Sequence, residues 1–436
     1  MSEAEVSVST AETSPILRTL SIEVGERRVK KAFDRAYRDL AKQVRVKGFR
    51  PGKAPRSVLE RMYGAGLAEE LEKSLVQETL LEAVKQSGVE PVSEPDIQSK
   101  PPLADAPFAY TAAIEVKPPI TLPALSGLPA TRPAVVVEES EVDAEIEQLR
   151  ERRAPLVDVG DDTPAAIGHQ ITIDYRGTLD GDPFEGGSAE NAVLELGSGR
   201  FIPGFEEQLV GARVGEEVTV RVSFPDDYPA EDLAGKDAVF EVTVRGLQHK
   251  ETPALDDEFA AGLGYENVET VEQLRARLRE NLEKERTEAA DQEARKTVVD
   301  ALIERTPFEV PPGMVQRRLT HRLEMAHQQL GQFMPHEELH QQLGRWQEEW
   351  RPDAERDVRE SLLLEAVADA QEFDASADEV TARIEEQAAE QGTAPDRLRE
   401  MYDSRGLMAG LESQIREEKA LEFLLAGAKV EETTGT

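Results

Sequence analysis

Apolar and polar residues alternate in two short stretches near the start of the chain. Ile16 to Val24 and Phe108 to Val116 have a period of two, as in strands that bury one face. Between them, apolar residues recur every three or four positions over Lys30 to Val44, from Pro55 to Met62 and over about Leu67 to Gln86, as on one face of a helix. These periods predict an α+β domain whose two strands pair over the helices.

The neighbouring stretches predict less regular structure. Residues 1–15 are rich in Ser, Thr and Glu and are expected to be loosely ordered, and residues 118–133 are rich in proline and small residues, as in an extended linker. Val135 to Val137 is a candidate strand. A charged helix is predicted over Glu139 to Arg153, and a new domain is expected to begin near Asp158.

Alternating patterns typical of strands dominate residues 160–248. Alternation is clear over His169 to Tyr175, Glu217 to Val222 and Ala238 to Val244, with turn residues between these stretches. A short helical piece near Pro203 to Leu209 interrupts the strands. The pattern predicts an antiparallel sheet wrapped over one short helix.

Beyond Pro253 the pattern is helical almost to the end of the chain. An apolar stripe begins at Val271, the chain breaks at Thr306-Pro307 and Pro311-Pro312, and a second helix follows from Met314. Further helices are expected over about Glu337–Glu372, Ala377–Gln391 and Pro395–Lys429. Such stripes fit either an open cradle with exposed apolar strips or a plain bundle that buries all of them.

Composition narrows the class of protein. At 436 residues the chain has room for two to four domains, and 39% hydrophobic, 5% aromatic and 32% charged residues suit an extended, helix-rich protein with much surface. The chain has no cysteine, which excludes disulfides and thiol chemistry. It has no apolar run of membrane-spanning length and no apolar signal core, so we expect a cytoplasmic protein that has no membrane partner.

The chain is acidic, with a net charge of −36, but it carries one basic stretch. Val46 to Pro55 places Phe49 at a tight turn beside Arg50 and Lys53, because two glycines and two prolines stop the helix there. Further cations flank the turn at Lys42, Arg45, Lys47, Arg56 and Arg61. A basic loop on an acidic body fits contact with a polyanion at one place, although an ordinary solvated hairpin loop has the same pattern.

The loop sequence resembles the signature of a known family. Gly-Phe-Arg-x-Gly-Lys-x-Pro, here from Gly48 to Pro55, is similar to the signature of bacterial trigger factor, the chaperone at the ribosomal exit tunnel. In that family the loop docks beside the tunnel, on ribosomal RNA and on a protein of the large subunit. The resemblance implies the same contact here and assigns ribosome binding to Arg45, Gly48, Phe49, Arg50, Pro51, Gly52 and Lys53.

The strand-rich part resembles a peptidyl-prolyl cis-trans isomerase domain of the FKBP type. The motifs that carry the resemblance are Tyr175-Arg-Gly-Thr, Asp-Pro-Phe184-Glu185, Gly199-Arg-Phe201-Ile202-Pro-Gly-Phe205-Glu-Glu, Phe224-Pro-Asp-Asp-Tyr228 and Val239-Phe240-Glu-Val. By position, the resemblance assigns the catalytic pocket to Tyr175, Phe184, Glu185, Phe201, Ile202, Phe205, Tyr228 and Phe240. The departures are Glu185 for the usual Asp, Phe205 for Trp, and Ala192 where many relatives have an aromatic wall. Without the resemblance, these aromatics also fit the core of a small β domain.

Prolyl isomerisation needs an apolar pocket and no nucleophile. Resonance keeps the prolyl amide planar, with a rotational barrier of ~18–20 kcal/mol. A pocket that binds the proline ring and accepts a twisted amide favours the transition state over the planar ground states, and removing water from the carbonyl helps. In this scheme Tyr228 donates a hydrogen bond to the substrate carbonyl and Glu185 shapes the polar edge.

The two resemblances together cover nearly the whole chain and imply its organisation. They give a ribosome-binding domain (1–117), a linker with the first part of the chaperone body (118–157), an isomerase domain (158–248) and a helical C-terminal chaperone domain (249–436). The implied fold class is α+β and multidomain. Its parts are an N-terminal α+β domain, an FKBP-like antiparallel β domain with a short helix, and a discontinuous all-α domain with long helical arms.

The implied function is that of an ATP-independent chaperone and isomerase. Such a protein docks at the ribosomal exit tunnel, holds nascent and unfolded polypeptides, and isomerises X-Pro bonds. It is a monomer on the ribosome and can form a weak homodimer when free. No cofactor is expected, since the chain has no ATP-binding loop.

Two other functions stay open. One is a free cytosolic isomerase and holdase that does not bind ribosomes. The other is a zinc hydrolase, because His336-Glu-Glu-Leu-His340 matches His-Glu-x-x-His, in which two histidines one turn apart hold the metal. However, Pro335 puts this match in the first turn of a helix, and Leu343 and Trp346 replace the Gly and third His of the longer motif. We therefore expect no metal there.

Overall fold

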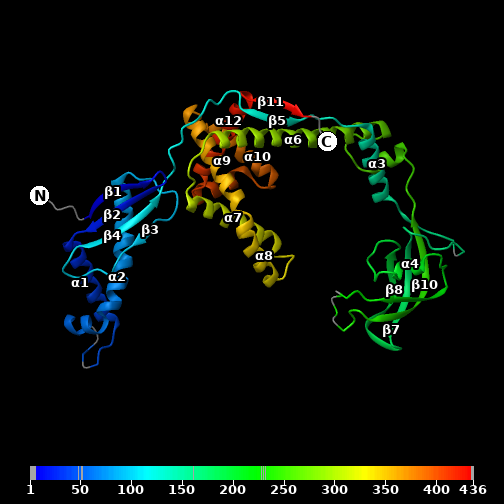
Figure 1. The fold of residues 1–436 in the computed structure, drawn as a ribbon, viewed down its shortest axis with the longest axis horizontal. Helices are drawn as coiled ribbons and strands as arrows, with labels where there is room; N and C mark the ends of the chain where they lie inside the picture. The colour runs from blue at the N-terminus through cyan, green and yellow to red at the C-terminus, as the bar shows by residue number, and fades with distance from the viewer. Residues whose placement is uncertain are drawn as a thin grey trace. The chain divides into compact units, whose positions relative to one another are not determined.

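The computed structural model describes residues 6–47, 49–50, 53–160, 162–226, 228, 230 and 232–433. The chain forms two compact units, one made of residues 1–133 with 291–434 and the other of residues 134–290. The first unit contains the N-terminal domain and most of the C-terminal helices, and the second contains the strand-rich insert (Figure 1).

Four antiparallel strands form the sheet of the N-terminal domain, in the order β1-β2-β4-β3. Their bounds are β1 Val6–Ser14, β2 Leu17–Val24, β3 Asp96–Gln98 and β4 Phe108–Glu115. Leu20 pairs with Ala112 in the β2–β4 ladder, which confirms the predicted pairing of the two alternating stretches. The expectation of a loosely ordered start is wrong for β1, because Val6 is buried in the core and the strand pairs with β2.

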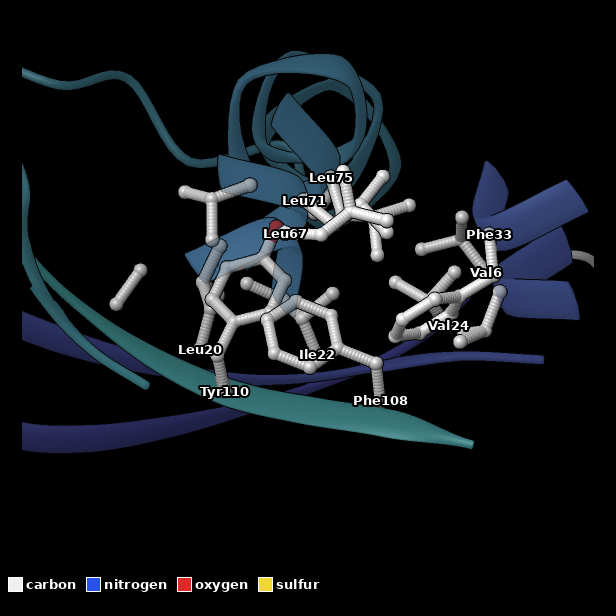
Figure 2. Packing of buried hydrophobic residues seen from close by; sticks show 14 of the residues in the cluster. Val6, Leu20, Ile22, Val24, Phe33, Leu67, Leu71, Leu75, Phe108 and Tyr110 are labelled. Atoms are coloured by element: carbon white, nitrogen blue, oxygen red, sulfur yellow. The ribbon is translucent and has the colours of Figure 1, made fainter. Parts of the chain in front are cut away.

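Two helices, α1 (Glu26–Gln43) and α2 (Arg56–Ser87), supply most of the rest of the N-terminal core. Figure 2 shows leucines of α2, such as Leu71, directed toward the rings of Phe108 and Tyr110 on β4. The rings of Phe108 and Tyr110 stack with centroids 5.4 Å apart. One face of the sheet is therefore covered, as the two-residue period of its strands predicted.

The second of these helices is longer than the sequence pattern indicated. Its 32 residues run without a break through the two stretches that we expected as separate helices. Gly64 and Gly66 lie between those stretches and bring no side chain to the apolar stripe, which explains the gap in the pattern. The helix ends at Gly88, which takes the left-handed conformation with φ 66°.

The expected linker after the N-terminal domain belongs to the core of the helical part of this unit. Leu128 is fully buried in a cluster with Val298 of α6 (Val271–Arg305). Next to it, β5 (Pro129–Pro133) pairs in parallel with β11 (Lys429–Thr433), a two-stranded ribbon that the sequence did not predict. Segments far apart in the sequence thus share one core, and the predicted discontinuous helical domain is confirmed.

Six further helices complete the described part of the first unit: α7 (Pro312–Leu330), α8 (His336–Glu349), α9 (Arg351–Ala370), α10 (Ala377–Glu390), α11 (Pro395–Arg405) and α12 (Met408–Ala426). Two helices that we expected to be continuous are divided. One breaks at Trp350, because Pro352 begins a new helix, and the other breaks at Gly406, which has φ 66°.

Within the described residues these helices bury their apolar stripes in three separate clusters. One joins α6, α9 and α12, another joins α7 and α9, and the third joins α10, α11 and α12. Large apolar side chains stay outside these clusters, with exposed fractions of 81% for Phe333, 44% for Met325 and 44% for Leu407. This arrangement favours open arms over a plain bundle that buries every stripe.

Five antiparallel strands form the sheet of the second unit: β6 Leu156–Asp158, β7 Gln170–Leu179, β8 Asp182–Glu195, β9 Glu217–Ser223 and β10 Asp237–Lys250. The order along the sheet is β6-β10-β7-β8, and β9 also pairs with β10. The short helix α4 (Phe205–Leu209) packs against the sheet, as predicted. β8 was missed because Gly186, Gly187 and Asn191 are residue types that are rare in strands.

Helices α3 (Glu139–Arg153) and α5 (Asp257–Gly262) and the start of α6 form a second core in this unit. The predicted α3 is confirmed with the same bounds. The candidate strand from Val135 to Val137 is wrong, since the guanidinium of Arg286 instead bonds the carbonyl of Val136. Throughout the described ranges, every helix is too short or too polar to cross a bilayer.

Candidate functional site

One cavity in the second unit collects the aromatic residues of the insert. Its volume is about 570 Å³. All eight residues that the sequence assigned to the pocket line it, namely Tyr175, Phe184, Glu185, Phe201, Ile202, Phe205, Tyr228 and Phe240. They come from β7, β8, β10, α4 and two loops, so distant segments of the insert converge on one place.

Ring-to-ring contacts form the floor and walls of the cavity. Phe205 and Phe240 are only 1% and 4% exposed, and their centroids lie 5.3 Å apart in an edge-on contact. Tyr175 meets these two rings edge-on at 6.2 and 5.9 Å. Phe201 stacks on Phe205 at 5.2 Å. Because each ring is held by its neighbours, the cavity is formed before any ligand enters.

Gly177 makes room for these rings. A Cβ at this position would lie 2.5 Å from a ring carbon of Phe240 and 3.0 Å from one of Phe184. Gly177 is also the direct partner of Phe240 in the β7–β10 ladder, so the strand runs close beneath the ring. The cavity floor therefore depends on a residue without a side chain.

We expect Gly177→Ala to lower the free energy of unfolding of the second unit by about 1–3 kcal/mol, because the added methyl group overpacks the cavity floor. Gly246→Ala is the matched control, since its Cβ would meet Thr172 at an ordinary 3.8 Å in the same sheet. Calorimetry of the full chain measures both. Equal stability of the two variants would contradict the role given to Gly177.

The loop that carries Phe201 is held by one buried carboxylate. Glu206 is 5% exposed and accepts hydrogen bonds of 2.8–3.2 Å. The donors are the Ser198 hydroxyl and the backbone N–H groups of Gly197, Gly199, Arg200 and Phe201. Burial raises the pKa of Glu206, but these hydrogen bonds outweigh burial and hold the pKa below its usual value.

Glu206 belongs to the motif from Gly199 to Glu207, but the motif alone assigns it no role. A signal was present, because this acid directly follows the pocket residue Phe205 and comes a few residues after the glycines of a turn. Only the fold shows that the turn wraps around the carboxylate.

The rim of the cavity carries two charged residues, Glu185 and Arg200, both exposed. Among the residues that the structure describes, neither forms an ion pair. The rest of the described lining is aromatic, aliphatic or glycine. The cavity therefore suits a small apolar ring whose polar groups stay at the edge.

Ala192, which the resemblance placed at a pocket wall, is not among the described residues that line the cavity. It lies on β8 opposite Ile173 and packs against the core of the insert. In this chain the described walls come from other residues.

The basic loop of the N-terminal domain is a second candidate site. Phe49 leaves 41% of its surface exposed, and its N–H bonds the carbonyl of Val46 at 3.1 Å. Val46 is buried in the domain core and anchors the loop. The exposed cations beside it are Arg45, Lys47, Arg50 and Lys53. Gly48, Pro51 and Gly52 lie outside the described residues.

Two of the cations that flank the loop are held in ion pairs. Lys42 pairs with Asp39 at 2.9 Å, and Arg56 pairs with Glu60 at 2.7 Å and also with Asp34. No ion pair in the described part of the chain involves the four exposed cations of the loop. Their charges therefore face solvent.

The His-Glu-x-x-His match gains no support as a metal centre. His336 and His340 are exposed at the start of α8, with ring centroids 5.9 Å apart. Across the described ranges, no group of three or more His, Asp or Glu side chains is placed to hold a metal ion.

Comparison with known families divides the chain into an N-terminal, an isomerase and a C-terminal part. Residues 6–149 match a family model described as bacterial trigger factor protein, and residues 270–426 match the model of its C-terminus. Residues 161–245 match the FKBP-type peptidyl-prolyl cis-trans isomerase. These last residues include all eight predicted residues that line the cavity.

Individual relatives match over nearly their full length. The trigger factor of Moorella thermoacetica is 41% identical over 416 residues, which cover 94% of this chain and 92% of the relative. That of Citrifermentans bemidjiense is 37% identical over 427 residues and 98% of each chain. A solved trigger factor chaperone, studied for promiscuous substrate recognition in folding and assembly, covers 96% of this chain at 20% identity with a TM-score of 0.47.

Proposed function

Because this chain belongs to the bacterial trigger factor family, we propose that it is a ribosome-associated chaperone that holds nascent chains and isomerises X-Pro peptide bonds. The observation that carries the isomerase assignment is the convergence of the eight pocket residues on one cavity. The matches to trigger factor on both sides of the insert support this function over the alternative of a free FKBP-type isomerase.

The cavity catalyses isomerisation by binding a twisted prolyl amide. The proline ring rests on the floor that Phe205 and Phe240 form, away from water. Tyr228 donates a hydrogen bond to a substrate carbonyl at the edge, and Glu185 shapes the polar side of the entrance. Loss of water from the carbonyl weakens the resonance that keeps the amide planar, and the barrier of ~18–20 kcal/mol falls without a nucleophile.

The basic loop docks on the large ribosomal subunit near the exit tunnel. Phe49 supplies an apolar contact for ribosomal protein, and Arg45, Lys47, Arg50 and Lys53 meet the phosphates of ribosomal RNA. We include Gly48, Pro51 and Gly52 in the proposed contact because they lie within the same signature. The net charge of −36 on the whole chain repels RNA elsewhere, so contact is confined to the loop.

The helical arms hold nascent and unfolded chains. Side chains such as Phe333 and Met325 offer apolar contact, and the acidic surroundings keep the complex in solution. Holding and release run on binding equilibria with no cofactor. We place this work in the cytoplasm, with a monomer on the ribosome and a weak homodimer when the protein is free.

We expect removal of the isomerase insert to separate prolyl isomerisation from the holding of unfolded chains. A variant without residues 160–248 should lose all isomerase activity and still suppress aggregation of an unfolded protein. The cut is feasible because Asp158 and Gln248 are partners in the β6–β10 ladder, so a short glycine-serine linker joins the ends. The core of α3, α5 and α6 stays intact.

Aggregation followed by light scattering and peptide isomerisation followed by absorbance measure the two activities. The intact chain is the control for both. A folded deletion variant that no longer suppresses aggregation would place the holding activity in the insert and contradict this division.

A further inference from the structure

The turn before α4 has the geometry of an anion-binding site, and the protein fills it with its own carboxylate. Gly197 and Gly199 have φ of 91° and 67°, a conformation that favours glycine. Backbone turned in this way directs successive N–H groups toward one point, which attracts an anion. Here that anion is Glu206, which lies five residues beyond the turn's last donor.

This carboxylate connects the floor of the cavity to its wall. Glu206 follows the floor residue Phe205 directly on α4, and it bonds the N–H of the wall residue Phe201 at 3.2 Å. Phe201 in turn stacks on Phe205 at 5.2 Å, and Ile202 continues the wall. Without the carboxylate, the N–H groups of the turn would have no common acceptor, and the wall would lose its fixed position over the floor.

We propose that Glu206 is a positioning residue of the isomerase, which holds residues 197–201 so that Phe201 and Ile202 close the cavity around the proline ring. The proposal rests on the proposed isomerase function. Glu206 is buried behind the wall and is not among the residues that line the cavity, so it acts through the loop and not on the substrate.

The proposal predicts which kinetic constant changes. Phe201 and Ile202 contact the proline ring, which keeps its shape while the amide rotates. The wall therefore binds the ground state and the transition state alike, and its loss raises KM while kcat changes little. A role in overall folding alone would instead lower the active fraction, so apparent kcat would fall at constant KM.

The test compares Glu206→Gln with Glu207→Gln in the full chain. The first substitution keeps the size of the side chain but places an amide group against N–H donors, whereas Glu207 is exposed beside it on α4 and is the matched control. With a chromogenic tetrapeptide that contains one X-Pro bond, we expect Glu206→Gln to raise KM about tenfold. Glu207→Gln should behave as the intact chain.

A milder pair of variants covers the case in which Glu206→Gln does not fold. Ser198→Ala removes one of the hydrogen bonds, 3.2 Å long, without changing the charge, and Glu206→Asp keeps the charge on a shorter side chain. Both should raise KM by about twofold to fivefold. Amide exchange should quicken at Gly199 and Phe201 in each variant and stay unchanged in the strands.

The outcomes separate the two proposals. An intact chain that does not isomerise the peptide would contradict the proposed function itself. An active intact chain with unchanged KM in Ser198→Ala, Glu206→Asp and any folded Glu206→Gln would contradict only the role of Glu206. A lower kcat at constant KM would also contradict it, since that result marks a purely structural residue.

Discussion

Replacing Phe49, Arg50 and Lys53 together with alanine is expected to abolish co-sedimentation of the chain with bacterial ribosomes. The variant removes the exposed ring and two cations that pair with no described residue, while buried Val46 still anchors the loop. Phosphate contacts dominate affinity for RNA and weaken as salt rises. The intact chain should therefore pellet at low salt and be released at high salt, and loss of each cation should reduce the salt slope by about 1.

The matched control carries the same kinds of change on another surface of the same domain. Lys73, Leu81 and Lys85 are exposed on α2, with Leu81 63% exposed, so their triple alanine variant removes two cations and one apolar side chain. This control should pellet with ribosomes as the intact chain does. If it also stays in solution, general charge and not the loop governs binding. If even the intact chain fails to pellet at low salt, the free isomerase and holdase becomes the better account.

Local periodicity predicted those elements whose packing partner lies close in the sequence or whose ends are marked by special residues. α3 has the predicted bounds because Val142 and Ile146 fall on one face and Glu138 and Glu141 form a capping box at its start. α2 ends at Gly88 because glycine readily takes the left-handed conformation of a helix terminus. Such signals lie within a few residues of the feature they define.

Elements that depend on partners far away in the sequence could not be predicted from local periodicity. β5 and β11 pair residue by residue from Pro129 with Lys429 to Pro133 with Thr433, and neither stretch alternates strongly. β1 holds mostly Ser, Thr and Glu, but pairing with β2 and burial of Val6 make it a strand. Tertiary contact overrides weak local preference in both cases.

In the pocket, too, the sequence could not predict single residues whose role depends on distant contacts. The order of five motifs, through its resemblance to the FKBP type, assigned the aromatic lining. Gly177 and Glu206 carried no comparable signal, since the importance of each comes from a contact across the fold. Gly177 must leave space for the ring of Phe240, and Glu206 must meet the N–H groups of a turn.

Tyr228→Ala and Phe240→Ala are each expected to slow prolyl isomerisation by a peptide assay about 10- to 100-fold. Full burial of an aromatic side chain contributes about 1.5–3 kcal/mol, and each 1.36 kcal/mol is tenfold in rate. Phe240 contacts Tyr175, Phe184 and Phe205, with centroids 5.9, 6.1 and 5.3 Å away, so its loss opens the floor. Tyr228 packs on Phe224 at 4.8 Å, and its loss opens the wall.

The neighbouring residue on the same strand provides the control. Val239 alternates with Phe240 on β10 and is 37% exposed on the other face, so Val239→Ala should leave the rate unchanged. Tyr228→Phe keeps the ring and removes the hydroxyl. A rate between those of the intact chain and Tyr228→Ala would assign part of the effect to a hydrogen bond from that hydroxyl.

Folding must be measured together with the isomerisation rate, because the two substitutions destabilise the insert to different extents. Phe240 is 4% exposed, and truncating such a side chain destabilises a domain by about 3–5 kcal/mol, whereas Tyr228 is only half-buried. A slow rate in Phe240→Ala alone would therefore be explained by unfolding of the insert. A slow rate in folded Tyr228→Ala requires the cavity itself, and unchanged rates in both folded variants would mean that proline binds elsewhere.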